Sequence, residues 1–219
     1  MSQLFAESHR SLQDAFGTRA LADRIEELAV ATAFDDYSRA FIESRDMFFL
    51  ATVDAEGRPT VSYKGGDPGF VRVQDASTLV FPSYDGNGMY LSMGNLSQMP
   101  EVGLLFIAFD RPYRLRVQGR ARLSREAADL ALFPEAELVV RVEATRIWPN
   151  CPRYVHRYEK VQASRYVPRS GCETPLATWK RVDVLQDVLP AAVTAQAAAT
   201  GTIGLDTWMQ KVVTGDPEA

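Results

Sequence analysis

The sequence predicts an α+β fold that is mainly β: an antiparallel barrel of six or seven strands with helices flanking it. Three observations predict this fold. Short apolar segments with strand alternation recur between residues 46 and 148. Tight turns join most of them, and helical segments interrupt them at only two places. Strands that follow one another in this way favour an antiparallel barrel over a parallel doubly wound sheet.

The N-terminal 45 residues are expected to be helical. Leu21, Ile25 and Leu28 recur at intervals of four and three residues, which places them on one face of a helix. Either Asp35 or Asp36 can cap a following helix. We expect these helices to be packing elements rather than sites.

The central region alternates between apolar segments and turn signals. A hairpin turn is expected at residues 54–57, and a helix is expected at residues 87–100 before Pro100 ends it. A short polar helix is expected at residues 124–133. The expected strands are residues 47–54, 59–65, 69–75, 77–83, 101–110, 113–123 and 137–148.

The last third of the chain has a different composition. Residues 149–168 are rich in Arg, Lys and Tyr and predict a helix or an ordered loop. Residues 184–213 are alanine-rich and helix-prone, with breaks at Pro190, Gly201 and Gly204. The organisation we expect is an N-terminal helical segment (1–45), a barrel domain (46–150) and a C-terminal helical and loop extension (151–219) that packs on the barrel or at a dimer interface.

Composition excludes several classes of function. The 219 residues are 46% hydrophobic and 24% charged, as in ordinary globular proteins. The net charge of −4 gives no basic footprint for nucleic acid. No apolar run approaches the length of a membrane span, and the N-terminus lacks an apolar signal core. With only two cysteines, we expect a soluble, cytoplasmic protein without a disulfide framework.

Motifs for metal, nucleotide or covalent chemistry are missing from the sequence. It contains no HExxH, no paired CxxC, no GxxxxGK[ST] loop and no GxSxG elbow. Cys151 and His156 could together bind a metal, and His156 could act as a general acid or base. A buried thiol beside a surface histidine is the more common arrangement. We therefore expect no metal site and assign no catalytic residue.

The stretch SYKGG interrupts a strand with polar side chains and two glycines. Ser62 and Lys64 are two residues apart, so they share a face of the strand. A hydroxyl and an ammonium side by side can hold a phosphate, and Gly65 and Gly66 would let a ligand approach the backbone. The alternative is a hairpin edge whose polar face is simply solvated.

A second group of donors lies around the start of the inserted helix. These are the hydroxyls and amides of Ser83, Asn87, Ser92 and Asn95. The N-terminus of a helix also favours an anion through its free N–H groups. Simple helix capping would explain the same residues. Together, however, the two groups favour an anion site.

Four segments follow one another within residues 46–123: MFFLATVDAEGRPTVSYKGG, TLVFPSYDGN, GNLSQMPEVGLLFI and YRLRVQGRARL. In this order and spacing they resemble the pyridoxamine 5'-phosphate oxidase-like superfamily of FMN-binding split barrels. They look most like its pyridoxamine phosphate oxidase-related flavoproteins, and NCPRYV is similar to a segment that follows the barrel in that subgroup. The flanking helical regions lie outside the resemblance.

The resemblance implies a split β-barrel of the FMN-binding type and a homodimer with two FMN molecules at the subunit interface. The strand at 59–64 would line the flavin, the strand end at 81–83 would offer backbone groups, and the loop and helix at 87–95 would cradle the phosphate. Residues near Arg114 and Gln118 would approach from the partner chain. The cofactor-binding residues predicted on this basis are Pro59, Val61, Ser62, Tyr63, Lys64, Phe81, Pro82, Ser83, Asn87, Ser92, Asn95, Arg114, Gln118 and Arg153.

One departure from the family pattern bears on the phosphate. Family members often carry an arginine or lysine after the GN of the phosphate loop, where this chain has Gly88, Met89 and Tyr90. The phosphate would then rely on Lys64, Ser92, backbone amides and Arg153. No counterpart of the substrate-phosphate residues of true pyridoxamine phosphate oxidases is found, which argues against the vitamin B6 reaction.

The function this predicts is an FMN-dependent oxidoreductase acting on an unknown small molecule, with NAD(P)H as a possible reductant. Alternatives are a non-catalytic flavin-binding or redox-sensing protein, and a split barrel that binds haem or a deazaflavin. The lack of an axial histidine on the barrel disfavours haem. A barrel without any cofactor is the remaining alternative.

Overall fold

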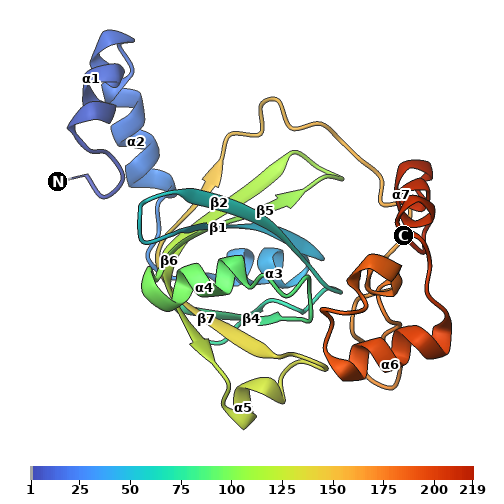
Figure 1. Ribbon diagram of the computed structural model, residues 1–219. Coiled ribbons are helices and arrows are strands. Elements are labelled where there is room, and N and C mark those ends of the chain that lie inside the picture. Colours follow the sequence, from blue (N-terminus) through green and yellow to red (C-terminus); the bar gives the residue numbers. More distant parts are fainter. Residues whose placement is uncertain (1) are drawn as a thin grey trace. The chain divides into compact units, whose positions relative to one another are not determined.

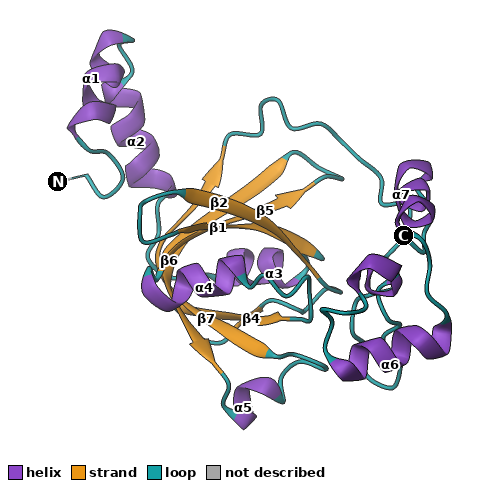
Figure 2. Ribbon diagram, in the orientation of Figure 1, coloured by secondary structure: helices purple, strands orange, loops and turns teal. Residues whose placement is uncertain are grey.

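The computed structural model describes residues 2–219 and divides the chain into two compact units, with the boundary after Glu159. The first unit holds an N-terminal pair of helices and the β-sheet, and the second holds the C-terminal helices. Figure 2 shows the strands gathered in the first unit. No helix among residues 2–219 is long and apolar enough to cross a bilayer.

The first unit contains the seven strands that the sequence predicts. The third is reduced to two residues, and the polar helix after the sixth strand keeps only four. The strands are β1 (Met47–Val53), β2 (Pro59–Gly65), β3 (Arg72–Val73), β4 (Thr78–Ser83), β5 (Glu101–Ala108), β6 (Tyr113–Ser124) and β7 (Leu138–Asn150). The helices are α1 (Glu7–Ala15), α2 (Arg19–Ala29), α3 (Asp36–Glu43), α4 (Leu91–Gln98) and α5 (Ala127–Leu130).

The strands form one antiparallel sheet in the order β2-β1-β5-β6-β7-β4-β3. The sheet is strongly curved: the Phe48 ring of β1 lies 4.9 Å from the Phe81 ring of β4, although three strands separate β1 from β4 in the sheet order. Within residues 2–219 no ladder joins the edge strands β2 and β3. The prediction of a split, antiparallel barrel with flanking helices is confirmed.

The core of this barrel follows from strand alternation. In β5 every second side chain from Val102 to Ala108 is buried, and β6 shows the same period. Helices α3 and α4 add buried apolar residues, including Ile42 and Leu96, to the same cluster. Figure 1 shows both helices drawn between the ribbons of β1 and β4.

The cap of α3 settles which of two adjacent aspartates begins the helix. The Asp35 carboxylate accepts a hydrogen bond from the Ser38 N–H at 2.7 Å. The Ser38 hydroxyl in turn accepts from the Asp35 N–H at 3.0 Å. Asp35 is therefore the N-cap, in a reciprocal capping box, and Asp36 lies in the first turn.

Helices α1 and α2 form a hairpin beside the barrel (Figure 1). Neither helix contains a buried residue. The chain leaves α2 and pairs with the sheet through Ala31, whose N–H and carbonyl both bond to Ile147 of β7 at 2.8 Å. The predicted stripe of Leu21, Ile25 and Leu28 does lie on α2, but all three side chains are exposed.

The adjacent glycines of SYKGG serve packing within the chain. A Cβ on Gly66 would overlap the ring of Phe70, which is a buried member of the core. A Cβ on Gly65 would lie 2.7 Å from the ring of Tyr63. These glycines thus make room for aromatic rings of the same segment, which is a reason for them that needs no ligand.

The second unit, taken by itself, is helical. It contains the 3₁₀ turns η1 (Thr178–Arg181) and η2 (Asp183–Leu185) and the helices α6 (Ala191–Thr200) and α7 (Leu205–Thr214). Pro190 directly precedes α6, and Gly201 and Gly204 separate it from α7, as the sequence predicts. Residues 149–168 form no helix.

Candidate functional site

One pocket of the barrel contains six of the predicted cofactor residues. It lies between β2, the end of β4, the following loop and the start of α4, and its volume is about 280 Å³. The predicted residues that line it are Val61, Ser62, Lys64, Ser83, Asn87 and Ser92. The residues that line it without having been predicted are Thr60, Tyr84, Gly86, Gly88, Met89, Tyr90, Leu91 and Met93.

Lys64 is the cation of this pocket. Its side chain is half-buried, and burial lowers the pKa of its ammonium below the ordinary value. Within residues 2–219 it has neither an ion-pair partner nor a side-chain hydrogen bond. A partly desolvated charge without a counter-charge is costly, so this position favours an anionic ligand.

Two hydroxyls join the walls of the pocket. The Ser62 and Ser92 oxygens lie 3.1 Å apart, and this contact links β2 to the first turn of α4. Ser62 and Lys64 lie on one face of β2, as their spacing predicts, because alternate residues of a strand point the same way. Thr60 continues this face, and the same period of two could have identified it from the sequence.

The loop before α4 brings backbone donors toward the pocket. Tyr90 precedes the helix in the left-handed conformation with φ of 47° and provides no side-chain cap. The first N–H groups of α4 have no intrahelical acceptor and carry the positive end of the helix dipole. Asn87 stabilises the loop, because its side-chain oxygen accepts from the Met89 N–H at 3.1 Å.

Tyr90 lines the pocket directly before α4 and forms a hydrogen bond across the loop. Its hydroxyl donates to the Glu137 carboxylate at 2.8 Å, and this hydrogen bond raises the pKa of the Tyr90 phenol. Tyr84 and Tyr90 also line the pocket, and the sequence does not predict them as binding residues because loop residues follow no regular period. Burial also raises the pKa of Tyr84.

The lining of the pocket contains no carboxylate, histidine or cysteine. Proton transfer between a paired acid and base, or attack by a thiolate, therefore has no side chains to perform it there. What the lining does offer is one cation, several hydroxyls, one amide and a helix N-terminus. The arrangement is suited to binding a phosphate-bearing molecule.

The remaining predicted residues lie outside the lining of this pocket. Tyr63 faces the other side of β2 and packs edge-to-face on Phe49 at 6.2 Å. Phe81 and Pro82 are buried in β4 and pair with β7. The others are Pro59 at the start of β2, Asn95, which donates to Thr52 at 3.0 Å, and Arg114, Gln118 and Arg153.

Arg114 and Gln118 belong to β6, and Gln118 lines a second, apolar groove of about 240 Å³. A row of directly paired residues crosses five strands here, and we call it the outer row: Tyr63, Phe49, Leu105, Arg116 and Trp148. Arg114 donates to the carbonyl of Cys151, and the Arg153 guanidinium lies 5.9 Å from the centre of the Tyr154 ring. The described chain does not bring these arginines into the pocket around Lys64.

No metal centre is found in residues 2–219, where no group of three or more His, Cys, Asp or Glu side chains comes together. Cys151 and Cys172 are both free and exposed. The expectation of a buried thiol is thus wrong for Cys151, whose sulfur accepts a hydrogen bond from the Arg153 N–H at 3.4 Å.

Comparisons with solved structures gave low identities. HupZ of Group A Streptococcus is 17% identical, with 57% of this chain and 100% of that chain covered and a TM-score of 0.45. An FMN-binding protein from Syntrophomonas wolfei is 13% identical, with 64% and 97% covered and a TM-score of 0.40. A protein from Clostridium acetobutylicum related to general stress protein 26 is 12% identical, with 52% and 85% covered and a TM-score of 0.40.

A search of curated proteins gave no match. Residues 34–157, in contrast, match the family described as pyridoxamine 5'-phosphate oxidase. The matched region takes in more than half of the chain and contains all of β1 to β7 together with the pocket around Lys64. The chain belongs to the pyridoxamine 5'-phosphate oxidase family.

Proposed function

We propose that the protein is an FMN-binding flavoprotein, and that it works as an FMN-dependent oxidoreductase on a small molecule. The observation that carries this proposal is the half-buried Lys64, without a counter-charge among the described residues, in the pocket that the family-matched region encloses. We further propose that the protein acts in the cytoplasm as a homodimer.

The residues present are suited to the phosphate of FMN. Lys64 supplies the charge, Ser62 and Ser92 supply hydroxyls, and the first turn of α4 supplies N–H groups. A single cation is fewer than an arginine-rich phosphate site would offer. We therefore expect FMN to be held less tightly than in relatives with a cation in the loop after Asn87.

FMN, when bound, supplies hydride or electron transfer, and the protein supplies position and electrostatics. Because the lining lacks a paired acid and base, the chain's own residues bind and orient rather than exchange protons. The Lys64 ammonium would stabilise negative charge that develops nearby. No side chain of the pocket need form a covalent bond to the substrate.

A homodimer with FMN at the subunit interface is part of the proposal. The pocket on one protomer is open and lies at the small end of the range for ligand sites. The outer row offers an apolar surface close by, and Val61 lines both the pocket and the groove of that surface. Arg114 and Gln118 would then reach FMN from the partner, as the family resemblance implies.

A non-catalytic flavin-binding or redox-sensing protein is the second candidate. The Tyr90–Glu137 hydrogen bond favours it, because it leaves a tyrosine and a carboxylate where a phosphate-binding cation could stand. Proteins of this kind would bind FMN but would not be reduced rapidly by NADH or NADPH. The haem and deazaflavin alternatives differ from both in their absorption.

The visible spectrum of the purified protein, before and after addition of FMN and desalting, tests the proposal. Flavin bands that survive desalting, and that bleach rapidly with NADPH or NADH, are expected for the oxidoreductase. Retained flavin without rapid bleaching would favour the binding protein. A colourless protein that retains no FMN would overturn both the oxidoreductase and the binding protein. Absorption bands of haem or of a deazaflavin would show that the protein binds that cofactor instead of FMN.

A further inference from the structure

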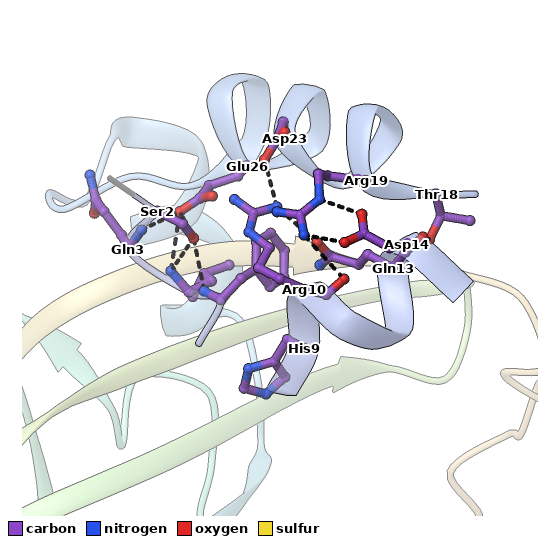
Figure 3. Close-up of polar contacts among 12 residues, drawn as sticks. Ser2, Gln3, His9, Arg10, Gln13, Asp14, Thr18, Arg19, Asp23 and Glu26 are labelled. Atoms are coloured by element: carbon purple, nitrogen blue, oxygen red, sulfur yellow. Dashed lines mark hydrogen bonds and ion pairs between the residues drawn. The ribbon is translucent and has the colours of Figure 1, made fainter. Parts of the chain in front are cut away.

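The N-terminal hairpin of α1 and α2 is built with its polar groups inside. Arg10 of α1 lies between the helices and pairs with Asp23 of α2 at 2.6 Å, and Arg19 pairs with Asp14. The Glu26 carboxylate accepts from the Ser2 hydroxyl at 3.0 Å. Figure 3 shows these side chains facing one another between the two helices.

Glu26 also holds the segment that precedes α1. Its carboxylate accepts from the N–H groups of Gln3, at 2.5 Å, and Leu4, at 3.1 Å. Burial would raise the pKa of Glu26, but these hydrogen bonds outweigh it and lower the pKa. The contacts that close the hairpin are thus mainly polar: these hydrogen bonds, the ion pairs, and a cation–π contact of Arg10 on the Phe5 ring at 4.9 Å.

The apolar side chains of the hairpin point away from this polar interior. Leu21, Ile25 and Leu28 of α2 are exposed, and Leu28 keeps 77% of its surface accessible. Leu12 of α1 and Phe16 after it are exposed as well, Phe16 to 78%. An amphipathic helix of a globular protein normally turns such a stripe toward a core.

A helix pair of this size gains little stability from exposed ion pairs, and most helical stability in proteins comes from packing of an apolar face. Within residues 2–219 no apolar surface covers the stripe of Leu21, Ile25 and Leu28. A contiguous apolar surface of this kind marks an interaction site. The hairpin lies outside the family-matched region, which begins at Phe34.

We propose that this hairpin packs on a second copy of the chain and clasps the two protomers together. The hairpin is acidic, with five carboxylates and three arginines between residues 2 and 30. The outer row of the sheet is apolar with a basic residue, Arg116, that has no ion-pair partner among the described residues. The apolar stripe is therefore matched in kind by the apolar outer row, and the net negative charge of the hairpin is opposite to the charge of Arg116.

The attachment point of the hairpin supports the same partner. Ala31 bonds to Ile147, and the next residue of β7, Trp148, is a member of the outer row. The hairpin thus starts at the margin of the surface through which the homodimer is proposed to form. A two-fold arrangement over that surface brings each hairpin to the margin of its partner. An anionic membrane is disfavoured, because the hairpin carries a net negative charge.

Photo-cross-linking of the full chain tests this contact. Leu28 is replaced by p-benzoylphenylalanine, and equal amounts of ¹⁴N- and ¹⁵N-labelled protein are mixed, unfolded, refolded together and irradiated. Cross-linked peptides that combine both isotopes, between position 28 and the strands of the outer row, are expected. Cross-links of one isotope only would overturn the proposal, because the stripe would then be covered by its own chain.

Sedimentation equilibrium with paired variants provides the second measurement. The double variant Ile25→Gln/Leu28→Gln should raise the dimer dissociation constant at least about 10-fold, while its helical circular dichroism stays that of the wild type. The matched control Glu27→Gln, an exposed change on the same helix, should change the constant less than about 2-fold. An unchanged constant in the double variant would overturn the clasp.

The inference rests on the homodimer of the proposed function, and the outcomes separate the two. If the wild type is a dimer and the double variant dimerises equally tightly, the homodimer is supported and the proposed packing of the hairpin on the partner is overturned. If the wild type is a monomer at every concentration, both the homodimer and the packing of the hairpin on a partner are overturned. Binding of the wild type, but not of the double variant, to phosphatidylcholine–phosphatidylglycerol vesicles would overturn the second copy in favour of a membrane.

Discussion

The hydroxyl oxygens of Ser62 and Ser92 lie 3.1 Å apart and join the edge strand β2 to the first turn of α4. These two residues come from segments thirty positions apart in the sequence. Their contact brings the ammonium of Lys64 and the N-terminus of α4 to one pocket. The pocket therefore depends on a contact between β2 and α4 as well as on the charge of Lys64.

Replacing Lys64 by methionine should weaken FMN binding about 10- to 100-fold, since a hydrogen bond to a charged group contributes about 1.5–3 kcal/mol. Fluorescence quenching of FMN on titration with protein measures the constant. Arg111→Met, which removes an exposed cation from the turn between β5 and β6, is the matched control. Equal affinities of the two variants would show that Lys64 does not bind the phosphate.

As the pH rises, the affinity for FMN should begin to fall at a lower pH than it would with a lysine of ordinary pKa. Burial lowers the pKa of Lys64 from 10.5, and the phosphate requires the protonated form. Affinity should therefore be constant from about pH 7, where the phosphate is a dianion, and decline as the pH rises through the lowered pKa. The same titration with Lys64→Met should be flat in this range.

Burial of the Lys64 ammonium should also make the stability of the ligand-free protein depend on pH. Without ligand, the unfolded chain binds a proton at Lys64 more readily than the folded chain does, so the free energy of unfolding rises with pH between the lowered pKa and 10.5. Urea unfolding of wild type and Lys64→Met across this range should converge as pH rises. Divergence would contradict the burial of this ammonium.

Introducing a cation into the loop should strengthen FMN binding. Met89 lines the pocket and is exposed, so Met89→Lys adds a charge near the N-terminus of α4 without disturbing the core. We expect an affinity gain of about 3- to 10-fold that decreases with added salt. Met99→Lys, just after α4 and outside the pocket lining, is the control and should leave affinity unchanged.

Gly66→Ala should destabilise the barrel by about 1–3 kcal/mol, because the new methyl group would overlap the buried Phe70 ring. Gly94→Ala on α4 is the matched control: nothing lies within 4 Å of its Cβ, and alanine is the better helix former. Its expected effect is a small gain, up to about 1 kcal/mol. Urea unfolding compares the two, and equal stabilities would count against the packing account of Gly66.

Asp35→Ala should cost about 1 kcal/mol at neutral pH, the usual contribution of an N-cap. Asp36→Ala removes a carboxylate from the first turn alone and should cost less. Hydrogen bonds from Ser38 lower the pKa of Asp35, so its contribution is lost as pH falls through this lowered pKa. The difference between wild type and Asp35→Ala should therefore shrink on acidification, as unfolding curves would show.

The strands could be predicted from the sequence because alternate residues of a strand point to opposite faces, so that buried and exposed side chains alternate with a period of two. Alternation in β5 and β6 marks the buried face directly, and turn residues mark the ends. The same period places Ser62 and Lys64 together on one face. Periodicity does not predict which strands lie close together in space. An example is the contact between Phe48 of β1 and Phe81 of β4 across the core.

Loops and surfaces were harder to predict, for physical reasons that two cases illustrate. Gly66 looks like a ligand site in the sequence, yet its space is taken by Phe70, four residues later, through a turn whose geometry no pattern specifies. Nothing in the sequence indicates a partner for Tyr90, yet its hydroxyl donates a hydrogen bond to Glu137 across the loop. Apolar spacing likewise identifies the stripe of α2 but not whether this chain or another covers it.

The pair of hydrogen bonds between Ala31 and Ile147 has a consequence for aggregation. The β4 ladder on β7 runs from Leu138 to Glu143, and the Ala144 N–H donates to the carbonyl of Ser77 at 2.7 Å. Beyond Ala144, β7 would present unpaired backbone groups on that side. Ala31 occupies one such position and interrupts the open edge. An unprotected edge of this kind is a template for strand addition from another chain. Ala31→Pro, which lacks the donor N–H, would reopen it and favour insoluble assemblies.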